Sequence, residues 1–294
     1  MIICPNCRTF LSLNISPEMN CTSCGFRSTL EKGIPFFAQD YEKTFVDHTS
    51  EAVRNLIKNA HSHFWMIARR KIISDTIVKY LGPGDMFLEV GSGPADVSAD
   101  LRHRGIAVTV SDIQIDGLIH AINLGNDSVV QFDVYRPIYL DHFDAVGAFD
   151  VIEHLENDLT AVRNMLGMVK PGGLVFVTVP AHSWLWNNRD RMESHKRRYS
   201  KRHLQTLFND AGGTIIEVHY LFFVILPLLI LRAIFDRFRK KEKFDSTDRA
   251  NSMRINPLIN WLLLKFMNAE IAIFGKRSPP IGGTLMLVAR KNNR

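Results

Sequence analysis

One stretch decides the fold of this chain, Met86-Phe87-Leu88-Glu89-Val90-Gly91-Ser92-Gly93-Pro94-Ala95. Its apolar first half predicts a buried strand, and the glycines after Val90 predict a tight turn that opens a helix. Because glycine has no side chain, the backbone of this turn can approach a ligand closely, and the first N–H groups of the helix are free to bind it. The stretch therefore predicts a ligand site at the end of a strand.

An acid follows at the distance expected for a ribose contact. Asp112 follows the apolar run 106–110 about twenty residues beyond the turn, where a doubly wound sheet places the carboxylate that binds ribose hydroxyls. The dinucleotide fingerprint would have a third glycine near Ala95, and an acid at Glu89 is unusual for it. A carboxylate at Glu89 could hold a cationic ligand. The stretch resembles motif I of the class I S-adenosylmethionine (SAM) methyltransferases, and the alternative is an ordinary strand, turn and helix with a solvated acid.

From Asp85 onward, strand and helix signals alternate, which predicts a parallel sheet covered on both faces. The expected strands are 86–90, 106–111, 128–132, 144–149, 174–179, 214–220 and 284–290. The segment Lys170-Pro171-Gly172-Gly173 is expected to make the turn before the fifth of them. The predicted fold class is therefore α/β, with a Rossmann-like sheet of seven strands.

The motifs along this sheet, taken in order, resemble a class I SAM methyltransferase. They are the glycine-rich turn, Asp112, Asp133, the run Phe149-Asp150-Val151-Ile152-Glu153-His154 and the segment 170–173. The resemblance implies SAM as the cofactor. It also implies a role for each matching residue: Glu89, Gly91, Ser92 and Gly93 at the methionine part, Asp112 at the ribose, Asp133 and Val134 at the adenine, and Phe149 and Asp150 beside the sulfonium.

The four cysteines form the strongest short motif of the chain. They lie in two Cys-x-x-Cys pairs with thirteen residues between them, at Cys4, Cys7, Cys21 and Cys24. Four thiolates at this spacing can bind one structural zinc ion, and so short a segment would need the metal for its stability. Two disulfides are the alternative, although cysteines confined to one end of the chain favour a reducing, cytoplasmic setting. With Gly33-Ile34-Pro35 behind them, they resemble the small zinc-ribbon proteins that activate methyltransferases, which implies a structural or docking role.

A loop of aromatic and charged residues follows the fifth strand, at the end of the sheet where open α/β folds bind ligands. It resembles a bacterial and archaeal branch of methyltransferases with the loop Pro-Ala-His…Trp…Asp…His-x-Arg-Arg-Tyr, whose members are often suspected of acting on glycans or lipid-linked glycans. We expect a catalytic base at His195 or His154, with Asp190 as its orienter or as an alternative base. The expected acceptor contacts are Trp184, Arg197, Arg198 and Tyr199. The alternative is a solvated basic helix face.

Residues 221–275 form an apolar insertion before the last strand. Its first run is too short to span a bilayer, which needs about 20 apolar residues, and Pro227 interrupts it. Apolar segments flanked by lysine and arginine suit a membrane interface, and the net charge of +6 favours acidic partners. We expect peripheral contact with the inner face of the membrane from the cytoplasm. A helical pair packed on the sheet or in a dimer is the alternative.

These signals divide the chain into a zinc ribbon at 1–40, a helical linker or lid at 41–84, and a methyltransferase domain at 85–294. We expect the enzyme to move a methyl group from SAM to an oxygen or nitrogen of a small-molecule or lipid-linked acceptor, a glycan or glycolipid. An RNA methyltransferase that docks nucleic acid on the ribbon is the alternative. It is disfavoured because the fourth strand is not followed by the Asn/Asp-Pro-Pro-aromatic turn common in enzymes that methylate base amino groups. A scaffold without catalysis is a third hypothesis, which the retained motifs disfavour.

Overall fold

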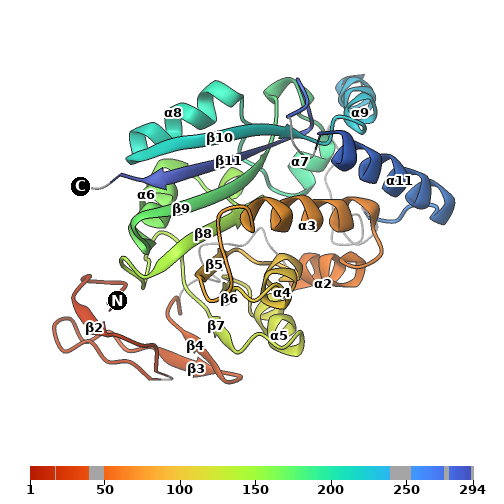
Figure 1. Cartoon of the computed structure of the whole chain (residues 1–294). Coiled ribbons are helices and arrows are strands. Elements are labelled where there is room, and N and C mark those ends of the chain that lie inside the picture. The colour runs from red at the N-terminus through yellow and green to blue at the C-terminus, as the bar shows by residue number, and fades with distance from the viewer. Residues whose placement is uncertain (17, 40–49, 239–252, 275–277, 293–294) are drawn as a thin grey trace.

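The computed structural model of the chain describes residues 1–16, 18–39, 50–238, 253–274 and 278–292 (Figure 1). The start of the expected linker and the basic run 239–243 of the insertion lie outside these residues.

Seven strands form one mixed sheet in the order β10-β11-β9-β8-β5-β6-β7. They are β5 (Met86–Val90), β6 (Ala107–Ser111), β7 (Ser128–Val130), β8 (Phe143–Phe149), β9 (Val169–Pro180), β10 (Gly213–Leu221) and β11 (Thr284–Lys291). The strands from β9 to β7 are parallel, whereas β11 runs antiparallel to both β9 and β10. The predicted Rossmann-like α/β fold is confirmed, with an antiparallel strand inserted near one end of the sheet.

The fifth strand begins earlier than the sequence indicates. β9 starts at Val169, so the segment 170–173, predicted as a turn before the strand, lies within it. Val169 pairs with Phe143 and Leu174 pairs with Ala145, and the chain therefore bulges between these two pairs. The left-handed backbone of Gly172 (φ 74°) permits this bulge. The two glycines therefore mark a β-bulge within β9, and the prediction of a turn before the strand is wrong.

Helices cover both faces of the sheet. On one face α6 (Asp158–Met168) and α8 (Lys201–Ala211) contribute side chains to the core. On the other, α3 (Phe64–Ile77), α4 (Asp96–His103) and α5 (Ile115–Asn123) do so. The other helices among the described residues are α2 (Ser50–Asn59), α7 (Asn188–Met192), α9 (Leu226–Phe238) and α11 (Pro257–Phe274), with 3₁₀ turns η1 (Ile152–His154) and η2 (Ser183–Leu185).

The N-terminal segment lies beside the β7 edge of the sheet (Figure 1). It contains two antiparallel pairs, β1 (Ile2–Ile3) with β2 (Phe10–Ser12) and β3 (Thr29–Glu31) with β4 (Ile34–Phe36). The side chain of Gln131 accepts from the N–H of Ala38 at 2.9 Å and donates to the Ala38 carbonyl at 3.2 Å. The N–H of Ile3 donates to the carbonyl of Ile138 at 2.8 Å. The backbone of Gln131, directly after β7, also accepts from the N–H of Phe37 and donates to the carbonyl of Pro35, both at 3.0 Å, so backbone groups at this edge of the sheet are paired.

The insertion forms α9 and α11, between β10 and β11. Met267 of α11 packs with Phe64 and Ala68 of α3, so one side of the insertion belongs to the core. The exposed large apolar residues are Leu228, Leu231, Ile234, Phe235 and Phe238 on α9, and Leu258, Ile259, Trp261, Leu262, Phe266 and Ile273 on α11. Among the described residues, α11 is the single helix whose length and mean hydropathy of 1.3 would allow it to cross a membrane, judged by length and composition alone.

Candidate functional site

The glycine-rich turn after β5 has a backbone that few residues adopt. Gly91 (φ 68°) and Gly93 (φ 53°) lie in the left-handed region. A Cβ at Gly91 would also lie 2.6 Å from a methyl carbon of Val151, closer than a side chain can come. Ala95 adopts the same left-handed conformation (φ 53°) although it is buried, which costs roughly 1–2 kcal/mol for a residue with a side chain. The turn therefore keeps a glycine-like shape at a position where this chain has alanine.

Asp112 holds this turn from the end of β6. One carboxylate oxygen accepts from the N–H of Gly93 and the other from the N–H of Gln114, both at 2.8 Å. Burial raises the pKa of Asp112, and the backbone donors oppose the rise. Gly117 of α5 lies against the same turn, because a Cβ there would come within 2.5 Å of the Gly93 carbonyl oxygen. The residue expected to bind ribose thus also positions the turn.

Glu89 lies at the base of α4. One of its oxygens accepts from the N–H of Ser98 at 3.0 Å and from the Ser98 hydroxyl. Burial raises the pKa of Glu89 to about 7, while the bonds from Ser98 oppose the rise. Its side chain is not among those that line the hollows above the turn. The carboxylate expected at the methionine part of the cofactor therefore supports α4.

Two adjoining hollows lie above the turn, and together they form what we call the turn cavity. They share the lining residues Leu56, Gly91, Gly93, Asp150 and His154. One hollow adds Asp112, Gln114 and Tyr135, and the other adds Ser92, Phe149 and Arg69. Six residues expected at the cofactor therefore gather around one cavity.

The two residues expected at the adenine do not line this cavity. The Asp133 carboxylate accepts from the N–H of Tyr135 at 2.9 Å, and Val134 is buried in the core. Tyr135, from the same short segment, lines the turn cavity. Asp133 thus shapes the loop that presents Tyr135.

A buried ion pair joins α3 to the end of β8. Arg69 donates to the carboxylate of Asp150 and to the carbonyl of Phe149, both at 2.6 Å. The ring of Trp65 lies 5.5 Å from the Arg69 guanidinium carbon, in a cation–π contact. Trp65 and Arg69, both in the segment expected as a linker or lid, therefore form part of the cavity wall, and the sequence analysis assigned neither of them to the site.

A second hollow, which we call the loop cavity, adjoins the first. Both are lined by Trp65, Asp150, Arg189, Glu193 and His195. The loop cavity adds the charged side chains Glu153, Asp190, Arg198, Arg232 and Arg254. It also adds the apolar side chains Ile225, Leu228, Leu229, Ile255 and Leu263 from the insertion and the residues beside it. Figure 1 shows α3, α7, α9 and α11 near one another at this end of the sheet.

Asp190 fixes the ring of His195. One Asp190 oxygen accepts from Nδ1 of His195 at 2.8 Å and from Nε of Arg198 at 2.7 Å, and the other accepts from the N–H of Asn187 at 2.9 Å. Burial acts to raise the pKa of Asp190, but the bond from His195 and the charge of Arg198 outweigh it and the pKa is lowered. Since the ionised carboxylate only accepts, Nδ1 of His195 carries a proton and Nε2 is the ring atom left for other partners. Asp190 is an orienting residue in this geometry.

Three of the four expected acceptor contacts lie away from both cavities. Tyr199 is fully buried, and its hydroxyl donates to Asp158 at 2.8 Å. Arg197 pairs with the same carboxylate at 2.8 Å. Trp184 is 43% exposed and packs against the ring of His182. Only Arg198 of this set lines the loop cavity, and the insertion supplies Arg232, which the sequence analysis did not assign.

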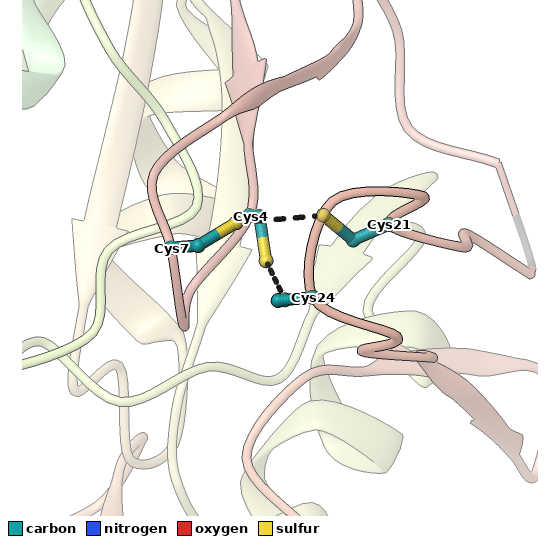
Figure 2. A group of neighbouring side chains, drawn as sticks. All are labelled: Cys4, Cys7, Cys21 and Cys24. Carbon is teal, nitrogen blue, oxygen red and sulfur yellow. Dashed lines mark hydrogen bonds between the residues drawn. The ribbon is translucent and has the colours of Figure 1, made fainter.

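Among the described residues, two groups of side chains could hold a metal ion. The ligand atoms of Cys4, Cys7, Cys21 and Cys24 lie within 4.8 Å of one another, and all four thiols are free. Figure 2 shows the two knuckles facing each other, with Sγ of Cys4 3.5 Å from that of Cys24 and Sγ of Cys7 3.5 Å from that of Cys21. Four converging thiolates fit a tetrahedral zinc ion. Glu153, His154 and His195 form the second group, within the same distance of one another.

The sequence profile of the family described as "Methyltransferase domain" matches residues 64–218. Among curated proteins, the ubiquinone biosynthesis O-methyltransferase of Shewanella halifaxensis is 30% identical over 100 residues, which are 32% of this chain and 42% of that protein. The enzyme of the same name from Xanthomonas campestris pv. campestris is 30% identical over 105 residues, or 33% of this chain and 43% of that protein. The chain thus spans about two fifths of the length of the curated relatives it matches.

Solved structures show the same fold. A chain from the complex between the Haloferax volcanii Trm112 methyltransferase activator and a putative methyltransferase aligns with a TM-score of 0.55 and 15% identity, over 87% of this chain and 98% of that one. Phosphoethanolamine N-methyltransferase 2 of Haemonchus contortus, in complex with SAM, aligns with a TM-score of 0.55 and 15% identity, over 91% of this chain and 62% of that one. At these identities the likeness concerns the fold alone.

The contact between Gly117 and the turn gives a direct test of the turn cavity. Replacing a helical glycine with alanine ordinarily stabilises a helix by about 1 kcal/mol. Gly117→Ala should instead lower the melting temperature and weaken SAM binding, because the new methyl group would displace the Gly93 carbonyl. Gly167→Ala in α6 is the matched control, since nothing lies within 4 Å of the added atom there. Thermal unfolding and calorimetric titration measure both effects, and equal behaviour of the two variants would contradict the assignment.

Proposed function

The chain belongs to the methyltransferase domain family and is a class I SAM-dependent methyltransferase, and we propose that it methylates an oxygen or nitrogen of a small-molecule or lipid-linked acceptor. The observation that carries this proposal is that the turn cavity and the loop cavity meet. They share Trp65, Asp150 and His195 among their lining residues. A donor in the first cavity and an acceptor in the second would have their reacting atoms side by side, and such positioning supplies much of the rate acceleration.

In this proposal SAM occupies the turn cavity. Its ribose lies at Asp112, its adenine near Tyr135, and its methionine part over the turn at 91–93. The sulfonium then lies close to Phe149 and Asp150, where the two hollows share a wall. The negative charge of Asp150 favours a cationic sulfur at that point.

The transfer is a single displacement at the methyl carbon. A lone pair of the acceptor would form the new bond to the methyl carbon while the bond from sulfur to carbon breaks, the electrons of that bond would remain on sulfur in S-adenosylhomocysteine, and the proton of the acceptor would pass to a base or to water. The side chains that would meet the reacting atom of the acceptor are His195 and His154, whose ring centres lie 4.7 Å apart. Asp190 acts through His195 by holding Nδ1.

The lining of the loop cavity supports an amphiphilic acceptor. Arg198 and Arg232 supply positive charge for an acidic or phosphorylated group, and Leu228, Leu229 and Leu263 supply an apolar wall for a chain. We propose a glycan or glycolipid, in line with the loop pattern at 180–199. The name of the curated relatives, ubiquinone biosynthesis O-methyltransferase, supports oxygen as the methylated atom. The apolar wall speaks against RNA, which would need stacking and phosphate contacts instead.

We propose that the four cysteines bind a structural zinc ion, so that residues 1–40 act as a built-in stabilising module beside the catalytic domain at 85–294. The likeness of the fold to a methyltransferase solved with an activator protein supports a partner role for this segment. In the same proposal, the described part of the expected linker or lid, residues 50–84, covers the cavities, and the apolar faces of α9 and α11 rest on the inner face of the membrane from the cytoplasm.

SAM binding tests the first part of the proposal. Asp112→Ala should weaken binding about five- to 150-fold, because the loss of a buried acceptor leaves donors unpaired at roughly 1–3 kcal/mol. Asp116→Ala, four residues later on α5, removes a carboxylate that pairs with the exposed Arg54 and should leave the affinity unchanged. Calorimetric titration measures both. If Asp112→Ala binds SAM with unchanged affinity, Asp112 does not bind the ribose.

Metal analysis tests the ribbon. The double variant Cys7→Ser with Cys24→Ser should lose a bound zinc ion and melt at a lower temperature, since so small a module depends on its metal. Both residues are exposed, so the substitutions themselves disturb no core packing. Ser23→Ala, within the second knuckle, is the control and should keep the ion. A ribbon that holds no zinc in the unsubstituted chain would refute this role.

Vesicle binding tests the outer face of the insertion. Phe235→Ser with Trp261→Ser should reduce binding to anionic vesicles by about tenfold or more, because each exposed aromatic side chain gains roughly 1.5–3 kcal/mol on burial. Salt should also weaken binding, since the basic residues act through screened charges. The control is Ile122→Ser on α5, another exposed apolar residue. If the intact chain does not bind vesicles, α9 and α11 have a role other than membrane contact.

A further inference from the structure

Glu153 is an unusual residue in this site. Its side chain is fully buried in η1, and within the part of the chain that the structure describes neither of its carboxylate oxygens has a hydrogen-bond partner. A buried carboxylate without partners is strongly disfavoured, because its charge has been removed from water without compensation. These two oxygens are therefore open to a ligand that the described residues do not supply.

Two imidazoles lie beside this carboxylate. His154 is the next residue in η1, and His195 comes from the loop after β9, so the cluster joins segments that are far apart in the sequence. One ligand atom of each of Glu153, His154 and His195 lies within 4.8 Å of the other two. Carboxylate and imidazole are the ligands that divalent transition metals take in catalytic sites.

The orientation of His195 also suits a metal ligand. Asp190 accepts from Nδ1 at 2.8 Å, which leaves Nε2 as the atom that can coordinate. A histidine held by a carboxylate through its other nitrogen is the usual arrangement at metal centres, since the carboxylate fixes the ring and raises its basicity. A carboxylate oxygen of Glu193 lies 3.4 Å from Nε2 of His195, so Glu193 would lie beside an ion bound at that nitrogen.

We propose that Glu153, His154 and His195 bind a divalent transition-metal ion, such as zinc, that takes the acceptor oxygen as a further ligand. Three protein ligands with an open position are typical of catalytic zinc. The place of the cluster agrees with this role: His154 and His195 line the turn cavity, and Glu153 and His195 line the loop cavity. The role of the acceptor rests on the proposed methyl transfer, whereas the metal site itself does not.

The chemistry balances without another reactant. A hydroxyl of the acceptor bound to the ion loses its proton to water more readily, as metal-bound water does. The resulting oxygen attacks the methyl carbon of SAM, the bond from sulfur to carbon breaks, and sulfur keeps the electron pair. The products are the methyl ether, S-adenosylhomocysteine and one proton.

Metal analysis of the full chain tests the proposed site. The two ions can be told apart because the ribbon would bind its ion through thiolates, whereas this site would use a carboxylate and two imidazoles. We expect the unsubstituted chain to bind two zinc ions, one of which is lost in Glu153→Gln and the other in Cys7→Ser with Cys24→Ser. Glu217→Gln removes a carboxylate that lies 2.8 Å from His219 on β10 and should keep both ions. A single ion that the cysteine substitutions remove would overturn the proposal.

Cobalt gives a test that needs no substitution at Glu153. The intact chain titrated with cobalt should show thiolate-to-cobalt absorption from one ion and, from a second ion, only the weaker bands of nitrogen and oxygen ligands. Asp190→Asn should weaken the second site about 10–100-fold, as loss of a carboxylate behind a ligating histidine does. Cobalt that binds only with thiolate absorption would refute the site. SAM titration of the same samples keeps the two proposals apart, because a chain that binds SAM without a second ion refutes this inference alone.

Discussion

The buried pair between Arg69 and Asp150 is the interaction on which the site depends. It ties α3 to the end of β8, and the second bond from Arg69, to the Phe149 carbonyl, fixes the backbone beside it. Asp150 lines both hollows of the turn cavity and the loop cavity, so all of them are shaped around this carboxylate. Removal of one partner of a buried pair costs roughly 3–5 kcal/mol, a large part of the 5–15 kcal/mol that stabilises a domain. Stability and cavity shape therefore rest on the same contact.

The N-terminal segment contacts the loop after β7, which forms one wall of the turn cavity. Gln131, fully buried after β7, bonds to Ala38, and Ile138 bonds to Ile3. Between these two anchors runs the segment that contains Asp133, which was expected at the adenine, and Tyr135, which lines the turn cavity. If the four cysteines bind zinc as proposed, loss of the ion would loosen the ribbon and free this wall of the turn cavity at both ends.

Local sequence patterns predicted the sheet but not the side-chain partners. Apolar runs marked each strand, and glycines marked the turn, because burial and backbone freedom act within a few residues. The arginines and aromatic residues of the loop carry no such local signal. Tyr199 was expected at the acceptor, yet it bonds to Asp158, 41 residues away, and Arg69 meets Asp150 across 81 residues. Which charged residue enters a cavity is decided by such distant pairings, which no window of the sequence contains.

One of the acids that line the loop cavity has no cationic partner among the described residues. Four acids line it, and among the described residues three of them have a cationic partner: Asp150 has Arg69, Asp190 has Arg198, and Glu193 has Arg189. Glu153 lies between these pairs with no such bond. In the proposed reaction, the sulfonium of SAM lies in this region and loses its charge when the methyl group is transferred. A second cation held at Glu153 would meet the one carboxylate of this lining that has no cationic partner among the described residues, whereas Arg232 and Arg254 add positive charge on the side of the insertion.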